Sequence, residues 1–334
     1  MSRQKHCNIP VFIPELACPH QCVFCNQEKI SNTFSVPTPS EIGEIIDSYL
    51  ATISKGTEIN IAFFGGSFTG IPQDKMIDYL KVAHSYVKIG KVQGIRISTK
   101  PDYITNPILD ILEQYGVTAI ELGAQSTNNK VLLKSGRGHK FDAIENAAKL
   151  IRNRNFELGL QMMLGLPYDT LELSLQTARD IVRLKADTTR IYPTVVVKET
   201  VLEKMYNAGT YAVLSLEDAV SWSKEVLKIF NEAGVKVLRV GLHPSEELEL
   251  GKSLVAGPIH PSFKEMVLSE LWNDLLKDKQ IKKGKSIAKV AKNQLNYAIG
   301  YKGKNRKSLQ TKGYDIKFVA DKTLKDFEFY VCYN

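Results

Sequence analysis

The 334-residue sequence has no long apolar segment and few cysteines. Apolar runs such as residues 60–64 and 193–197 are far shorter than the roughly 20 residues that a membrane-spanning helix needs. The first eight residues are polar and basic, and no apolar stretch follows them as it would in a secretory signal. We therefore expect a cytoplasmic protein that does not insert into a membrane.

The five cysteines do not suit a disulfide framework, which would spread an even number of them along a shorter chain. Three of them, Cys18, Cys22 and Cys25, lie within eight positions. Clustered thiols in a reducing compartment indicate metal or redox chemistry. Cys7 and Cys332 stand apart, and we expect them to take no part in it.

The positive charge is concentrated near the C-terminus. Residues 277–334 contain 15 basic and five acidic residues, a net charge of +10, so the first 276 residues carry about −2 of the total of +8. Together with the 43% hydrophobic content, this predicts a near-neutral catalytic body with a basic module attached.

Short β-rich runs alternate with amphipathic stretches six or seven times, which is typical of βαβ units and a parallel sheet. Unusual residues gather at the expected carboxyl ends of the strands, where barrels carry their active sites. We therefore predict an α/β fold with a partial or complete (β/α) TIM-type barrel, rather than a doubly wound sheet. The expected strands are 9–14, 59–64, 94–99, 118–122, 157–163, 190–196 and 235–240, and the expected helices are 39–53, 74–87, 107–115, 141–152, 171–184, 216–233 and 263–276.

The most specific motif is Cys18-Pro-His-Gln-Cys22-Val-Phe-Cys25, directly after the first expected strand. Three thiolates on one loop can bind three irons of a [4Fe–4S] cubane and leave the fourth iron without a protein ligand. Phe24 would shield such a cluster and pack against a ligand. The alternative is a structural zinc site completed by His20, but closed zinc sites generally have their ligands in two separated pairs.

This spacing, C-x3-C-x-aromatic-C after the first strand of a barrel, resembles that of the radical S-adenosylmethionine (SAM) superfamily. In that superfamily the open iron binds SAM, and one-electron reduction cleaves it to methionine and a 5′-deoxyadenosyl radical that abstracts hydrogen from the substrate. The resemblance therefore implies two cofactors, a [4Fe–4S] cluster and S-adenosyl-L-methionine. It also implies an electron donor such as flavodoxin or ferredoxin.

Three further segments resemble the superfamily's SAM-binding motifs. Residues 63–68 look like the motif for the methionine amine, with serine in place of the frequent glutamate, although a plain tight turn would look the same. Residues 121–126 resemble the segment that meets the ribose and carboxylate, and residues 161–167 the segment beside the adenine. Met162 and Met163 there are otherwise more often core residues. The contacts so implied come from Gly65, Gly66, Ser67, Glu121, Gln125 and Gln161.

A narrower resemblance, over about residues 8–270, is to the catalytic subunit of Elongator and its prokaryotic relatives. It rests on residues 98–103, 190–200, 202–211 and 257–263. Those relatives modify the wobble uridine of tRNA at C5, which implies tRNA or another RNA as the substrate.

Two differences limit what this narrower resemblance implies. The cysteine spacing is shorter than in those relatives, and the 58 residues after Leu276 are too few for their acetyltransferase domain, so acetyl-coenzyme A chemistry is not predicted. Lys100, Tyr192 and Lys198 lie near the expected barrel mouth and are candidate catalytic contacts to the substrate, although a role in the fold would equally explain each of them.

Residues 277–334 are expected to form a separate KH-like RNA-binding module, with the barrel domain spanning residues 1–276. The sequence predicts a helix at 286–294, a Gly-x-x-Gly loop, a second helix and a strand at 314–319. KH domains clamp single-stranded nucleic acid with such a loop. The glycines would admit phosphates to the main chain and the basic residues would neutralise them; these residues are Gly300, Lys302, Gly303, Lys304, Arg306 and Lys307.

One residue departs from the KH pattern. Arg306 stands where a KH helix usually has an aliphatic residue, and Leu309 is the candidate to replace it. A solvated basic appendage with an ordinary glycine turn is the alternative.

Three functions are compatible with these patterns. We prefer a radical SAM enzyme that modifies a nucleotide of tRNA or another RNA, which the module delivers to the barrel mouth. The second is the same chemistry on a small molecule or a protein side chain. The third is a non-catalytic RNA-binding protein that keeps an iron–sulfur cluster for stability.

Overall fold

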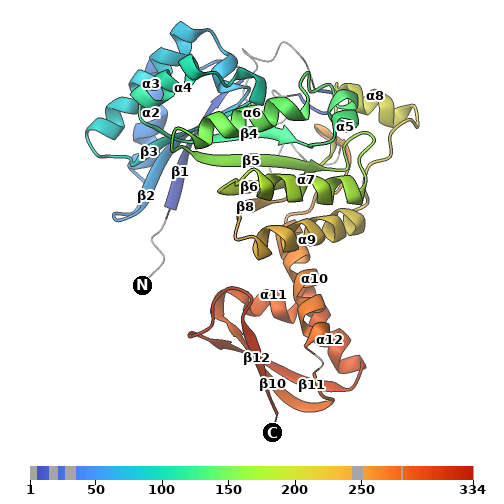
Figure 1. The fold of residues 1–334 in the computed structure, drawn as a ribbon. Coiled ribbons are helices and arrows are strands. Elements are labelled where there is room, and N and C mark those ends of the chain that lie inside the picture. Colours follow the sequence, from blue (N-terminus) through green and yellow to red (C-terminus); the bar gives the residue numbers. More distant parts are fainter. Residues whose placement is uncertain (1–5, 15–21, 27–34, 243–250, 280, 334) are drawn as a thin grey trace.

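The computed structural model of the chain describes residues 6–14, 22–26, 35–242, 251–279 and 281–333 (Figure 1). Its main part is a seven-stranded parallel sheet in the order β1-β2-β3-β4-β5-β6-β8. Each crossover adds the next strand on the same side, so the sheet curls into a partial barrel, as predicted. The strands are β1 (His6–Ile13), β2 (Glu58–Gly65), β3 (Gly94–Thr99), β4 (Val117–Gln125), β5 (Glu157–Leu164), β6 (Thr188–Pro193) and β8 (Lys236–Val240).

Helices cover the outer face of this sheet. Alternate strand residues such as Ile61, Ile97 and Leu160 are fully buried in the main apolar cluster, because side chains alternate between the two faces of a strand. The residues between them line the inner face and include Arg96 and Glu121. The longer helices are α2 (Pro39–Leu50), α3 (Gln73–Lys88), α4 (Asn106–Gln114), α6 (Phe141–Arg152), α7 (Leu171–Arg183) and α9 (Leu216–Glu232).

The sequence missed three short features of the barrel. Helices α5 (Asn129–Lys134) and α8 (Val201–Asn207) span less than two turns each, too little for a helical period to show. The expected strand 190–196 was too long. It ends at Pro193, and β7 (Val196–Val197) pairs instead with β9 (Leu254–Ala256) in a separate antiparallel sheet. No helix in the described ranges is long and apolar enough to cross a membrane.

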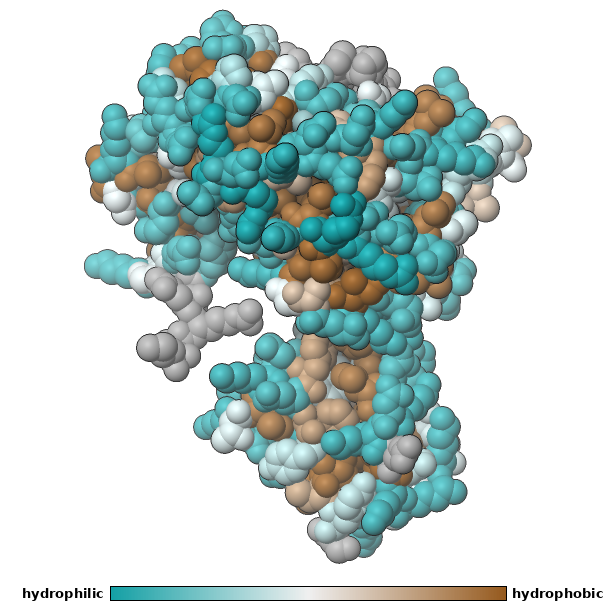
Figure 2. Space-filling model, viewed as in Figure 1, coloured by the Kyte–Doolittle hydropathy of each residue, from teal (hydrophilic) through white to brown (hydrophobic). Residues whose placement is uncertain are grey.

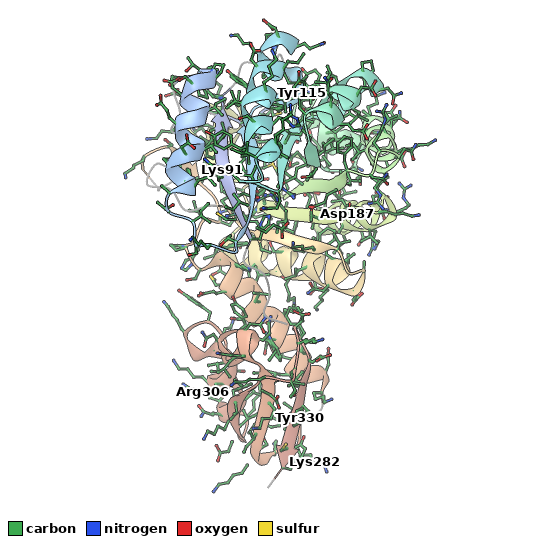
Figure 3. All side chains as sticks on the ribbon, turned by 90° about the vertical axis from the view of Figure 1, so that its left-hand side faces the viewer. Lys91, Tyr115, Asp187, Lys282, Arg306 and Tyr330 are labelled. Carbon is green, nitrogen blue, oxygen red and sulfur yellow. The ribbon has the colours of Figure 1, made fainter. Side chains whose placement is uncertain are left out.

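The C-terminal residues form a three-stranded sheet in the order β11-β10-β12, with two helices (Figure 3). The predicted helix at 286–294 is wrong, because this segment begins in the central strand. Ser286, Ala288 and Val290 are buried at every second position, but Ile287, Val290 and Ala291 also fit a helical spacing, which hides that period in the sequence. The elements are β10 (Gly284–Ala291), α11 (Leu295–Ile299), α12 (Lys304–Thr311), β11 (Tyr314–Asp321) and β12 (Phe329–Tyr333).

Helix α10 (Phe263–Asp278) belongs to both parts of the chain. Its first half packs Phe263 and Val267 into the main apolar cluster, whereas Trp272 and Leu276 belong to the module's own cluster. Hydrophobic side chains accordingly continue from the barrel into the module (Figure 2). The Trp272 indole N–H also donates to Gln294 at 3.0 Å. The helix runs through residue 276, the boundary that the sequence suggested between two domains; that division remains a prediction.

Salt bridges also attach the second half of α10 to the barrel. Lys224 and Lys228 of α9 each place Nζ 2.7 Å from Asp274 Oδ2. Because all three groups are only partly exposed, these pairs are less screened than fully exposed ones. The barrel therefore holds α10 both through the apolar packing of its first half and through the ion pairs of Asp274. Helix α10 in turn carries the module.

Candidate functional site

The described part of the cysteine loop, residues 22–26, forms a turn after β1. Cys22 is buried, Cys25 is half-buried, and the Cys25 N–H donates to the Cys22 carbonyl at 3.0 Å. Phe24 packs with the small apolar cluster around α8. Cys18 lies outside the described residues, and within the described part no three cysteine, histidine or acidic side chains come together as a metal site.

Two short helices hold this turn through its backbone. The Val23 N–H donates to the carbonyl of Ser135, just after α5, at 3.1 Å. The Leu202 N–H, at the start of α8, donates to the Val23 carbonyl at 2.7 Å. The turn is thus clamped between the two helices that the sequence did not reveal.

Arg137 joins the turn to the end of β4. Its Nη1 donates to Cys22 Sγ at 3.0 Å, and its Nη2 donates to the carbonyl of Gly123. The side chain is buried, and its Nε has no hydrogen-bond partner among the described residues. The guanidinium thus places a positive charge next to the Cys22 sulfur. Sequence reasoning missed this residue; its only signal was an arginine between two glycines.

The glycine pair after β2 shapes a close turn against β1. Gly65 has φ +111°, and a Cβ there would collide with the Ile13 carbonyl, which accepts the Gly66 N–H at 2.9 Å. The buried Ser67 then precedes a short 3₁₀ helix, η1 (Phe68–Gly70). This turn is by itself a sufficient reason for glycine at position 65. It also places the segment beside the C-terminal end of β1, which leads into the cysteine loop.

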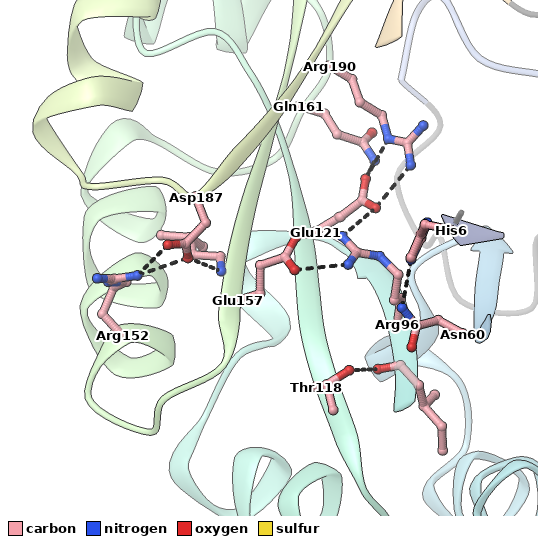
Figure 4. A network of polar contacts seen from close by, with 12 residues as sticks. His6, Asn60, Arg96, Thr118, Glu121, Arg152, Glu157, Gln161, Asp187 and Arg190 are labelled. Carbon is pink, nitrogen blue, oxygen red and sulfur yellow. Dashed lines mark hydrogen bonds and ion pairs between the residues drawn. The ribbon is translucent and has the colours of Figure 1, made fainter. Parts of the chain in front are cut away.

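Glu121 and Gln161 lie together in a charged network on the inner face of the sheet (Figure 4). Arg190 donates to both oxygens of Glu121, at 2.6 and 3.1 Å, and Gln161 donates to one at 3.1 Å. Arg96 lies 3.4 Å from Glu121 and binds Glu157 at 3.0 Å. Burial opposes ionisation of Glu121, but the two arginines outweigh it and hold the pKa of this carboxyl below its ordinary value.

Gln125, the last residue of β4, has a strained backbone. Its φ is 65°, a left-handed conformation that is uncommon outside glycine. Its amide lies near Gly123 and Arg137, and its Oε1 is buried with no hydrogen-bond partner among the described residues. A buried amide oxygen in this state is an acceptor that a bound ligand would satisfy.

The three candidate catalytic residues do not form one group. Lys100 is buried, with Nζ 3.2 Å from Asp102. Tyr192 lies on the inner face beside Arg190, and burial raises its pKa. The Lys198 Nζ donates to the Gly251 carbonyl at 2.8 Å. Among the described residues, no hydrogen bond or ion pair joins any two of the three.

The burial of His139 makes the free energy of unfolding depend on pH. The side chain is buried 3.9 Å from Asp102, and burial, with the charge of Arg137, lowers its pKa to about 4 from an unfolded value near 6.5. Its stabilisation is therefore complete above pH ~6.5 and lost as the pH falls toward 4. Between about pH 7 and pH 5, the free energy of unfolding should fall by about 2 kcal/mol more in the wild type than in His139→Gln.

Urea denaturation at the two pH values measures this difference. Asp169, whose pKa burial raises to about 6, titrates in the opposite sense, but it is present in both proteins and cancels in the comparison. Parallel pH curves for the two proteins would contradict the assignment.

The Gly-x-x-Gly loop between α11 and α12 is anchored to α10. Gly300 has φ +91°, and a Cβ there would lie 2.6 Å from the Asn305 backbone nitrogen. The buried Asn305 side chain donates to the Ser269 carbonyl at 2.8 Å, and the Tyr301 N–H donates to Ser269 Oγ at 2.8 Å. Gly303, with φ +74°, precedes the first turn of α12. The loop conformation therefore requires Gly300.

The basic residues of this loop differ in their surroundings. Lys302, Arg306 and Lys307 are exposed on the module. Lys304 is 2.5 Å from Glu270 of α10, so its charge is already balanced. Leu309 packs against the module's apolar cluster, the role that was considered for it in place of Arg306.

Comparison with known proteins gives two matches to family models. Residues 13–181 match the Radical SAM superfamily, and residues 186–273 match the Radical_SAM C-terminal domain. Together they include the cysteine turn, all strands of the partial barrel after β1, and the first part of α10.

Individual relatives point the same way. An uncharacterized protein of Methanocaldococcus jannaschii is 32% identical over 232 residues, 66% of this chain and 70% of that protein. Elongator complex protein 3 of Saccharomyces cerevisiae is 24% identical over 192 residues, 52% of this chain and 34% of that protein. A tRNA uridine(34) acetyltransferase of Methanocaldococcus infernus is 27% identical over 137 residues, 39% of this chain and 26% of that protein. The chain therefore spans about a third or less of these last two.

A solved structure supports the fold. The archaeal Methanocaldococcus infernus Elp3 with an N-terminal deletion superposes with a TM-score of 0.64 at 18% identity, covering 84% of this chain and 64% of that chain. At this level of identity the likeness concerns the fold alone.

Proposed function

We propose, from the premise that this chain belongs to the radical SAM superfamily, that Cys18, Cys22 and Cys25 hold a [4Fe–4S] cluster with one iron left open for S-adenosyl-L-methionine. When bound, the two cofactors supply a one-electron cleavage that yields a hydrogen-abstracting 5′-deoxyadenosyl radical. The protein binds and orients these groups and excludes water from them.

The observation that carries this proposal is the contact of Arg137 with Cys22 Sγ at 3.0 Å, beside the ends of the barrel strands. Three thiolates would bring negative charge into a buried site, and a buried arginine offsets part of it. Helices α5 and α8 hold the backbone of the turn through Val23, between Cys22 and Cys25.

We place SAM along the ends of β2, β4 and β5. The unsatisfied Gln125 Oε1 offers a buried acceptor, and the turn at Gly65 and Gly66 leaves main chain without side chains for close approach. Ser67 and Gln161 complete the polar groups that we assign to this side of the site. Glu121, engaged by two arginines, would contribute by holding Arg190 and Gln161 in place.

We infer that the substrate is a nucleotide of tRNA or another RNA. This inference rests on the similarity to Elongator complex protein 3 and to a tRNA uridine(34) acetyltransferase, and on the glycine loop with its exposed basic residues. Phosphate contacts at the module would position the RNA, and the barrel would select the nucleotide. The target base must be unpaired or flipped out to enter the barrel.

The function is tested with the full-length protein, reconstituted anaerobically with iron and sulfide. With dithionite and SAM it should form 5′-deoxyadenosine, and tRNA from cells that lack the gene should lack a nucleoside that is present in normal cells. Mass spectrometry measures both products. An intact cluster spectrum without 5′-deoxyadenosine would contradict the enzymatic assignment.

If the glycine loop binds phosphates of the RNA, the affinity for tRNA should fall steeply as the salt concentration rises. In Lys302→Ala/Lys307→Ala, the loss of two phosphate contacts should weaken tRNA binding at low salt and reduce the slope of log Kd against log salt by about 1.5. The matched control, Lys88→Ala/Lys149→Ala, removes two exposed lysines of α3 and α6 and should leave the slope unchanged. Gel shifts across a salt series measure it; flat, weak binding by the wild type would favour a small-molecule or protein substrate.

A further inference from the structure

A hollow of about 290 Å³ lies where the barrel meets the module, and the proposed function does not use it. Its walls come from α9, from α10 and from the glycine loop between α11 and α12. Figure 1 shows α10 running from its place beside α9 down to the module. We call this hollow the junction pocket; α9 contributes Val220 and Ser221 to it, α10 contributes Met266 and Glu270, and the loop with the first residue of α12 contributes Tyr301 and Lys304.

Tyr301, which follows the first glycine of the loop, is held from two sides. Its N–H donates to Ser269 Oγ of α10 at 2.8 Å, and its ring meets the ring of His260 edge to face, with 5.6 Å between the centroids. His260 belongs to segment 257–263, for which the proposed function gives no role, and its Nδ1 accepts the Ser262 N–H at 2.9 Å. Because Tyr301 is only half-buried, the pocket has a fixed aromatic side chain at its border.

The charges that line the junction pocket are already balanced. The Lys304 ammonium lies 2.5 Å from Glu270, and the Lys224 ammonium lies 2.7 Å from Asp274. Glu217, in the first turn of α9, adds a further carboxylate to the lining. No lysine of the lining is therefore left to hold a phosphate, and the carboxylates would repel one. The pocket instead suits an uncharged ligand.

Positive charges without an ion pair among the described residues lie just outside the pocket, on the loop and the start of α12. A Cβ on Gly303 would lie 3.8 Å from Arg306 Nη2 and 3.7 Å from Lys307 Cε, so both long side chains pass close to this glycine. The Lys302 ammonium lies 5.4 Å from the centre of the Tyr301 ring. A phosphate bound by these cations would bring its own nucleotide next to the pocket.

We propose that the junction pocket takes one unpaired base of the RNA whose phosphate the glycine loop binds. This inference rests on the proposed function, because it assumes that the loop holds RNA. The base would stack on Tyr301, and its polar edge would face the Ser221 hydroxyl and the Glu270 carboxylate. Ligand pockets range from about 300 to 1,000 Å³, so a hollow at the lower end of this range suits one flat base rather than a longer segment.

The first test fills the pocket from the exposed Ser221 position of the full-length protein. The probes are a short oligouridylate and the same ribose–phosphate backbone with an abasic site at every position. Ser221→Trp should raise the Kd for oligouridylate about tenfold and leave the Kd for the abasic backbone unchanged, because only the stacked base is lost. The control, Ser85→Trp, makes the same change on the exposed face of α3 and should alter neither Kd. Fluorescence anisotropy measures both values.

The second test addresses the aromatic side chain. Tyr301→Leu should weaken oligouridylate binding about tenfold, whereas Tyr301→Phe, which keeps the ring, should bind like the wild type. The slope of log Kd against log salt should stay at the wild-type value in both variants, unlike that of Lys302→Ala/Lys307→Ala, because no phosphate contact is lost. An oligouridylate that carries 4-thiouridine should crosslink on irradiation to Tyr301 or Met266, which mass spectrometry of the peptides identifies.

The outcomes separate the pocket from the proposed function. Wild-type protein that binds oligouridylate and the abasic backbone equally well, with a steep salt slope, would overturn the pocket and leave RNA binding by the loop in place. Equal loss of affinity for both probes in Ser221→Trp would also overturn it, since the variant would then act on the phosphate contacts. Wild-type protein that binds neither probe at low salt would overturn both.

Discussion

Cys22→Ala is expected to lower 5′-deoxyadenosine formation by about 1000-fold or more, to the background level. The substitution removes one of three proposed iron ligands and leaves the Nη1 of the buried Arg137 without its sulfur acceptor. Iron and sulfide per chain, the absorbance of the reconstituted protein and product formation from SAM measure the effect. All three should fall together, because a cubane held by two thiolates is not retained.

Cys332→Ala is the matched control. This cysteine is exposed on β12 of the module, so its replacement should leave iron content and activity unchanged. Equal product from Cys22→Ala and wild type would exclude the cysteine turn as the cluster site. Stoichiometric zinc in anaerobically purified protein would replace the iron–sulfur assignment with a structural metal site.

Glu121→Ala should have the largest effect on stability, lowering the free energy of unfolding by about 3–5 kcal/mol. Glu121 is almost fully buried and accepts two hydrogen bonds from Arg190, so its removal leaves this guanidinium inside the protein without its carboxylate. The Arg96 guanidinium is affected less, because its ion pair with Glu157 at 3.0 Å remains. Urea denaturation near pH 7 measures the loss.

Two variants show whether Glu121 acts through the fold or by touching the cofactor. Glu121→Gln keeps a hydrogen-bond acceptor and should lose less stability than the alanine variant, and Glu157→Ala, at a half-exposed position, should lose about 1 kcal/mol. A Glu121→Ala protein of unchanged stability that no longer binds SAM would instead favour the direct contact implied by the sequence resemblance.

The barrel could be predicted because each strand and crossover helix carries its own period. The strand 94–99 and the amphipathic helix 141–152 are found with the expected bounds. The family was predicted from three cysteines spaced along one loop, a purely local signal, and is confirmed by the match over residues 13–181.

What could not be predicted depends on contacts between distant residues. Arg137 and Cys22 are 115 positions apart, and Arg190 and Glu121 are 69 positions apart, so nothing local marks them as pairs. The sequence at 286–294 fits a helix because Ile287, Val290 and Ala291 have helical spacing, and only the place of residues 284–291 between β11 and β12 makes them a strand.

The continuity of α10 determines how the glycine loop faces the barrel. Helix α10 packs against the module through Trp272 and Leu276, and against the barrel through Phe263 and Val267. One residue inserted between the two sets would turn the module by about 100° relative to the barrel, because a helix advances 3.6 residues per turn. The number of residues along this single helix therefore sets the angle between the module and the barrel.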